Sequence, residues 1–78
     1  MDQATVISNP QILFGKPVIA GTRVSVELIL DKIAAGDTYD EILEDYPQLT
    51  RDSILAAVRY ASLSLRRDTF HEFPSRVA

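Results

Sequence analysis

The sequence predicts a mainly α-helical fold, a trihelical helix-turn-helix core that follows a short N-terminal β-ribbon. Three segments between residues 26 and 65 space their apolar residues as amphipathic helices do, with repeats at i, i+3 or i+4, and i+7. A serine or threonine suited to capping a helix precedes each segment. Ahead of these segments, short β-branched runs are broken by glycine and proline, which favours strands and tight turns.

The N-terminal part predicts very short strands joined by shaped turns. A strand is expected over residues 5–8, where Pro10 follows closely and ends it. Residues 15–23 hold two glycines, a proline and two cations, and residues 20–22 are expected to form a hairpin-like turn. Because a two-stranded ribbon is hardly stable alone, we expect it to pack on the helices or pair with a second chain.

The first two helices have clear start and stop signals. Ser25 is the expected N-cap of a helix over residues 26–35, and Gly36 supplies its C-terminal stop. Thr38, with a glutamate three residues later, predicts a capping box at the start of the second helix. That helix ends before Pro47, because the residue that precedes a proline disfavours the α region.

The third helix is expected to begin after the cap Thr50 and to run to about Leu65. Its inner stripe is predicted to consist of Ile54, Val58, Ala61 and Leu65. We therefore expect one domain over residues 1–65 and a C-terminal tail over residues 66–78. The tail has no clear period, so it either docks on a surface or stays loose until a partner arrives.

The size and composition of the chain indicate a partner. A chain of 78 residues buries only about 60% of its unfolded surface, so it generally needs disulfides, a metal or another chain for stability. It has no cysteine and one histidine, which excludes disulfides and argues against structural zinc. We expect a homodimer or a complex with another protein, no cofactor or metal, no membrane span, and a cytoplasmic location.

The net charge of −3 argues against a purely electrostatic grip on nucleic acid. The charge is uneven, because residues 37–45 form an acidic cluster and the last twenty residues are rich in arginine. The acidic cluster is either a solvated face or a docking site for a basic partner. The sequence contains no carboxylate pair, Ser/His/Asp set or phosphate-loop spacing, so we expect neither an enzyme nor a small-molecule substrate.

The three-residue connection over residues 47–49 favours a helix-turn-helix whose third helix reads DNA with its N-terminal residues. Arg51 is placed for a bidentate contact with guanine, and Gln48 for a phosphate. The candidate DNA contacts are Gln48, Thr50, Arg51, Ser53 and Arg59. The candidate contacts to a partner protein or phosphate backbone are Lys16, Arg23, Arg66, Arg67, Phe70 and Phe73. The alternative is a protein–protein module, a homodimeric adaptor without DNA binding, whose third helix packs against another chain.

Several motifs together carry a resemblance to a known family. They are Ile7-Ser8-Asn9-Pro10, Gly15-Lys16-Pro17-Val18-Ile19-Ala20-Gly21-Thr22-Arg23-Val24, Val26-Glu27-Leu28-Ile29-Leu30, Gly36 and Tyr39-Asp40-Glu41-Ile42-Leu43-Glu44-Asp45-Tyr46-Pro47-Gln48-Leu49-Thr50. Over about residues 6–62 the chain resembles domain-of-unknown-function family 433. The resemblance does not extend to the C-terminal tail.

The resemblance implies a homeodomain-like, winged or trihelical helix-turn-helix fold. Members of this family are similar to antitoxins of bacterial type II toxin–antitoxin pairs. The implied partner is a small ribonuclease toxin of PIN-like fold, encoded by a neighbouring gene. Two tasks follow as expectations: neutralising this toxin by direct binding, and binding operator DNA to repress the shared operon.

Overall fold

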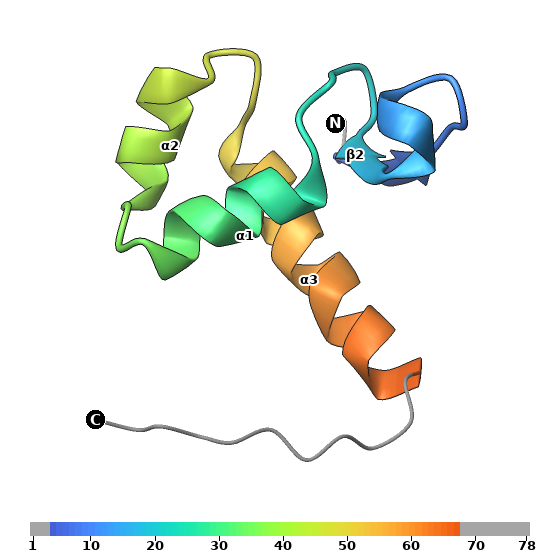
Figure 1. The fold of residues 1–78 in the computed structure, drawn as a ribbon. Helices are drawn as coiled ribbons and strands as arrows, with labels where there is room; N and C mark the ends of the chain where they lie inside the picture. Colours follow the sequence, from blue (N-terminus) through green and yellow to red (C-terminus); the bar gives the residue numbers. More distant parts are fainter. Residues whose placement is uncertain (1–3, 68–78) are drawn as a thin grey trace.

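The computed structural model describes residues 4–67, which form three α-helices and an N-terminal β-hairpin (Figure 1). The elements are β1 (Val6–Ser8), η1 (Leu13–Gly15, a 3₁₀ turn), β2 (Pro17–Ile19), α1 (Val26–Ala34), α2 (Tyr39–Asp45) and α3 (Arg51–Arg67). The predicted fold class, mainly helical with a short N-terminal ribbon, is confirmed. α3 ends two residues beyond the predicted end of the third helix.

β1 and β2 pair antiparallel within the chain, with Val6 opposite Ile19. Both strands contact α3, and β2 also contacts α1, so the ribbon packs on the helices as expected. The turn after β2 closes through a 3.0 Å hydrogen bond from the Thr22 N–H to the Ile19 carbonyl. Gly21 has φ +83°, a conformation that favours glycine in such a turn.

The connection between the two strands contains η1, which the sequence pattern did not predict. Leu13 and Phe14 have φ of 50° and 58°, in the left-handed region that non-glycine residues rarely occupy. The Phe14 side chain is 99% exposed, so no packing contact explains its conformation. A left-handed backbone at non-glycine residues leaves no mark on an apolar run such as residues 12–14, so the sequence pattern does not indicate this turn.

The predicted cap of α1 and its stop signal are both present. The Leu28 N–H donates to the Ser25 Oγ at 2.9 Å, which satisfies one of the free donors of the first turn. At the other end, the N–H groups of Gly36 and Asp37 reach back to the carbonyls of Ile33 and Lys32. These two bonds form a Schellman motif, with Gly36 at φ +97°.

α2 and α3 also begin with reciprocal caps. At α2, Thr38 and Glu41 form the complete predicted capping box. At α3, the Ser53 N–H donates to the Thr50 Oγ1 at 3.2 Å, and the Thr50 N–H donates to the Ser53 Oγ at 3.0 Å. Each cap fixes where its helix begins, and together they fix the ends of the connection between α2 and α3.

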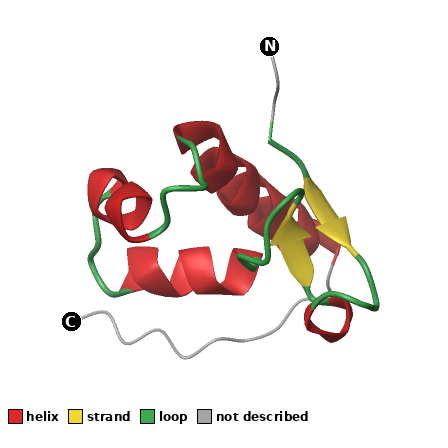
Figure 2. Cartoon of the chain, turned by 90° about the horizontal axis from the view of Figure 1, so that it is seen from above, coloured by secondary structure: helices red, strands yellow, loops and turns green. Residues whose placement is uncertain are grey.

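The core is built from one fully buried isoleucine of each helix, namely Ile29, Ile42 and Ile54. Ala57 is also fully buried in this core cluster, and as a small residue it permits close approach of a packed neighbour. Figure 2 shows the three helices gathered on one side of the hairpin. The C-terminal part of α3 projects away from the body of the domain (Figure 1).

Candidate functional surfaces

The connection between α2 and α3 presents the start of α3 at the surface. Leu49 is 5% exposed and anchors the connection in the core. Its neighbours Gln48, Thr50 and Arg51 are exposed. Three of the five predicted DNA contacts are therefore exposed at or just before the start of α3.

Arg51 is held by contacts within the domain. Its guanidinium lies 3.3 Å from the Asp40 carboxylate and 5.3 Å from the centre of the Tyr39 ring. The two partners of the ion pair are 63% and 90% exposed, and exposed pairs of this kind contribute about 0–1 kcal/mol. Another anion, such as a phosphate, can therefore displace Asp40 at low cost.

The two remaining predicted DNA contacts, Ser53 and Arg59, do not belong to this exposed group. Ser53 is only 4% exposed, and its hydroxyl bonds to Thr50. A side chain that points into the cap does not reach a base edge, so Ser53 supports the turn. Arg59 is exposed on α3, eight residues beyond Arg51 and about 12 Å further along the helix axis.

The predicted partner contacts are spread over the molecule. Lys16, at the start of β2, forms an exposed 3.0 Å ion pair with Glu27 of α1. Arg23 is exposed in the loop before α1, and Arg66 is exposed near the end of α3. Arg67 is the last residue of α3, while Phe70 and Phe73 lie outside the described residues.

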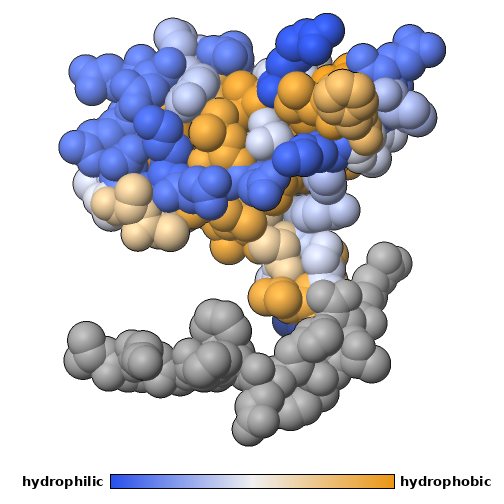
Figure 3. All heavy atoms as spheres, in the orientation of Figure 1, coloured by the Kyte–Doolittle hydropathy of each residue, from blue (hydrophilic) through white to orange (hydrophobic). Residues whose placement is uncertain are grey.

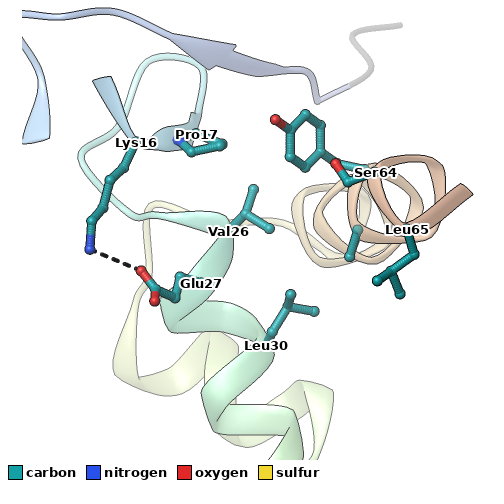
Figure 4. Close-up of a pocket in the computed structure, with 9 residues that line it drawn as sticks. Lys16, Pro17, Val26, Glu27, Leu30, Ser64 and Leu65 are labelled. Carbon is teal, nitrogen blue, oxygen red and sulfur yellow. Dashed lines mark hydrogen bonds and ion pairs between the residues drawn. The ribbon is translucent and has the colours of Figure 1, made fainter. Parts of the chain in front are cut away.

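A hollow of about 400 Å³ lies between the start of α1 and the projecting part of α3. We call it the α1/α3 notch. Figure 4 shows side chains of α1 and β2 on one side of it, side chains of α3 on the other, and the Lys16–Glu27 pair at its edge. The residues that line it are Lys16, Pro17, Val26, Glu27, Leu30, Tyr60, Ala61, Ser64 and Leu65.

Part of the predicted core is wrong on the third helix. Leu65 and Val58 were expected on the inner stripe of the third helix, but they are 72% and 38% exposed. The prediction failed because the stripe extends beyond the surface that the other elements cover, and the hollow beside Val58 and Leu65 is lined by residues of α3 alone. Figure 3 accordingly shows hydrophobic side chains on the projecting end of α3.

The exposed apolar residues of α3 also form a stripe on its outer side. Leu55, Val58 and Leu65 are 42%, 38% and 72% exposed, and Ser62 completes a spacing of i, i+3, i+7 and i+10. This is the a/d spacing of a coiled-coil seam. We call these four residues the α3 seam. Leu63, also exposed, lies off the seam.

The acidic surface of α2 is tied to α1 through Lys32. Its ammonium lies 3.2 Å from the Asp45 carboxylate, 3.8 Å from that of Asp37, and 5.6 Å from the centre of the Tyr46 ring. The hydrogen bond to Asp45 raises the pKa of Lys32, because it stabilises the charged ammonium. Lys32 thereby offsets part of the acidic cluster predicted from the sequence.

Two further classes of site are absent from the described part of the chain. Among residues 4–67, no group of three or more His, Cys, Asp or Glu side chains is placed to hold a metal ion. Within the same residues, no helix has the length and apolar character needed to cross a membrane. The surfaces that remain are the first turn of α3, the α1/α3 notch and the α3 seam.

These features define a small trihelical domain with a β-hairpin, in which α3 stays partly exposed among the described residues. The chain belongs to the family described as protein of unknown function (DUF433), whose model matches residues 6–61. It is 40% identical over 72 residues to uncharacterized protein y4eO of Sinorhizobium fredii (strain NBRC 101917 / NGR234). The match covers 88% of this chain and 33% of that relative, so it spans about a third of the relative's length. No solved structure matches the chain.

Proposed function

We propose that this domain is a cytoplasmic antitoxin that neutralises a PIN-like ribonuclease toxin by direct binding. The observation that carries the proposal is the α1/α3 notch, an apolar hollow that extends from the core onto an exposed helix. Binding sites are typically concave and lined mainly by apolar side chains with a few polar groups. The family resemblance supplies the kind of partner.

The notch suits an apolar ridge on a partner, such as one face of an amphipathic helix. Leu30 and Leu65 face the hollow from α1 and α3, so a partner side chain would contact both helices (Figure 4). Helices that bind in such grooves anchor through a few apolar residues at i, i+3 or i+4, and i+7. The exposed Lys16–Glu27 pair at the rim offers both charge signs for orienting contacts.

The test is growth rescue in cells that express the ribonuclease encoded beside this gene. Ser64 lines the notch but lies off the α3 seam, so Ser64→Arg blocks the hollow and leaves the seam intact. We expect this variant to lose rescue and to lose co-purification with the ribonuclease. The matched control is Leu63→Glu, which also places a charge on α3 but outside the notch. Full rescue by a folded Ser64→Arg variant would refute the notch as the toxin-binding surface.

A second candidate function is operator binding, through which the antitoxin would repress its own operon. The observation that favours it is the joint exposure of Gln48, Thr50 and Arg51 at the start of α3. In this reading Arg51 exchanges Asp40 for a base edge or a phosphate. If the domain does not bind DNA, the alternative is a homodimeric adaptor in which this face of α3 packs against another chain.

Operator binding is tested with a matched pair of substitutions at one ion pair. Arg51→Ala removes the cation, and we expect weaker binding to the promoter with a shallower dependence on salt. Asp40→Asn frees the cation, and we expect tighter binding. If both variants bind like the wild type, Arg51 has no part in DNA binding.

A further inference from the structure

Among the described residues, the α3 seam stays exposed, and only its Leu65 also belongs to the α1/α3 notch. Leu55, Val58, Ser62 and Leu65 follow heptad spacing over about 15 Å of helix. The hollow that lies on this side of α3 is lined by Val58, Ala61, Ser62, Leu65 and Arg66. Positions i, i+3, i+4 and i+7 of one helix are the four that surround a knob in coiled-coil packing.

We propose that the α3 seam binds the seam of a second copy of this chain in an antiparallel two-helix contact. The seam is self-complementary under a two-fold axis at the level of residue 60. Leu55 of each copy then lies opposite Leu65 of the other, and Val58 lies opposite Ser62. A closed two-fold interface requires such reciprocal contacts, in which residue i of each copy contacts residue j of the other.

Charge complementarity at the edge of the seam selects a second copy and fixes its direction. In the antiparallel pairing, Asp52 of one copy lies beside Arg66 of the other, and the two-fold axis repeats this pair. In a parallel pairing, Arg66 would face Ala61, and Asp52 would face Pro47 ahead of the helix, and neither position offers a charge. Asp52 and Arg66 are both exposed and therefore available for this contact.

The same pairing brings the two copies of Arg59 close together beside the axis. Like charges in this position oppose association, so removing them strengthens the contact. Arg59→Ala should therefore tighten the dimer by about two- to fivefold, the range expected for one exposed charge pair. A tighter dimer in Arg59→Ala is expected only for the antiparallel register, because that register brings the two copies of Arg59 together.

The α3 seam and the α1/α3 notch meet at Leu65 but are otherwise separate surfaces. The proposed dimer consequently does not depend on the proposed antitoxin function. Leu55→Glu changes the seam alone, and Ser64→Arg changes the notch alone. Loss of toxin binding and loss of the dimer are thus distinguishable.

The first measurement is sedimentation equilibrium of the full chain up to ~1 mM, a range that detects even weak association. We expect a concentration-dependent dimer, which Leu55→Glu weakens by at least ~100-fold because it buries an unpaired charge. Leu63→Glu is the control, since Leu63 is 51% exposed on the same helix but off the seam. A monomeric wild type, or equal effects of the two substitutions, overturns the proposal.

The second measurement uses the absence of cysteine from the chain. An equal mixture of Val58→Cys and Ser62→Cys variants is oxidised, and the products are identified by mass. The antiparallel register predicts mainly the mixed disulfide, whereas a parallel register predicts disulfides between identical chains. Crosslinking no greater than that of an exposed Glu44→Cys variant overturns the proposal, as does a predominance of identical-chain products.

Discussion

Replacing Ser53 with alanine should destabilise the domain without touching any surface that contacts a ligand. The Ser53 hydroxyl is buried, accepts a 3.0 Å hydrogen bond from the Thr50 N–H, and lies 3.2 Å from the Thr50 hydroxyl. In Ser53→Ala the Thr50 N–H loses its partner at the start of α3. Loss of a cap of this kind costs about 1–2 kcal/mol.

Two smaller effects set the net magnitude. Alanine favours the interior of a helix over serine by up to about 0.5 kcal/mol, which offsets part of the loss. The other half of the cap, from the Ser53 N–H to the Thr50 Oγ1, is unaffected because it uses the backbone of residue 53. The expected net loss is about 1 kcal/mol, which lowers the Tm of a domain of this size by about 4–8 °C.

The assay is thermal unfolding followed by circular dichroism, with Ser62→Ala as the control. Ser62 is exposed on the same helix, so Ser62→Ala gains helix propensity without losing a cap. An unchanged or raised Tm in Ser53→Ala would show that the cap does not stabilise α3. If Ser53→Ala instead weakened promoter binding with its Tm unchanged, the interior placement of Ser53 would be refuted.

Three further perturbations test the caps, the core and the charges. Gly36→Ala should cost about 1 kcal/mol in chemical denaturation because φ there is +97°, although an added methyl group would meet no atom within 4 Å. Ile42→Ala should cost about 2–5 kcal/mol, since Ile42 is fully buried in the core, and its unfolding midpoint should fall accordingly. The pKa of Lys32 is raised by Asp45, so this pair stabilises the fold below the ordinary Lys pKa and the effect disappears as alkaline pH rises through the raised value. Denaturant titrations from about pH 8 to about pH 12 should show this loss in the wild type and not in Asp45→Asn.

The helix boundaries were predictable because their signals are local. Ser25, Thr38 and Thr50 cap the helices as predicted, and Gly36 adopts the left-handed conformation that ends α1. Each of these interactions spans only a few residues, so the order of residue types is enough to indicate it. The family could be inferred in the same way, from motifs that are contiguous in the chain.

The side-chain roles at the start of α3 were harder to predict. Ser53 and Arg51 are polar residues in the same turn, and both were expected to face DNA. One is buried in a cap and the other pairs with Asp40 of a different helix. Which polar residue faces outward depends on how α2 and α3 pack, and the spacing of residues along one helix does not contain that information.

The wrong burial predictions for Val58 and Leu65 have the same cause, because they too depend on how the helices pack. They bear more directly on function. Periodicity indicates which face of a helix is apolar, but not how far the neighbouring helix extends along it. α1 has nine residues and α3 has seventeen, which correspond to about 13 Å and about 25 Å of helix. α1 is thus too short to cover α3 along its whole length, and Leu65, which faces α1 across the notch, remains 72% exposed.

An apolar stripe that outlasts its partner within the chain is difficult to explain by folding alone. Val58, Leu63 and Leu65 add little to the core of this domain, because each keeps more than a third of its surface exposed. Full burial of such a side chain is worth about 1.5–3 kcal/mol, and the share that these residues leave exposed is still available for binding. The stretch of α3 from Leu55 to Leu65, which contains both residues wrongly predicted to be buried, is thus the part best suited to bind other chains, with the notch on one side and the seam on the other.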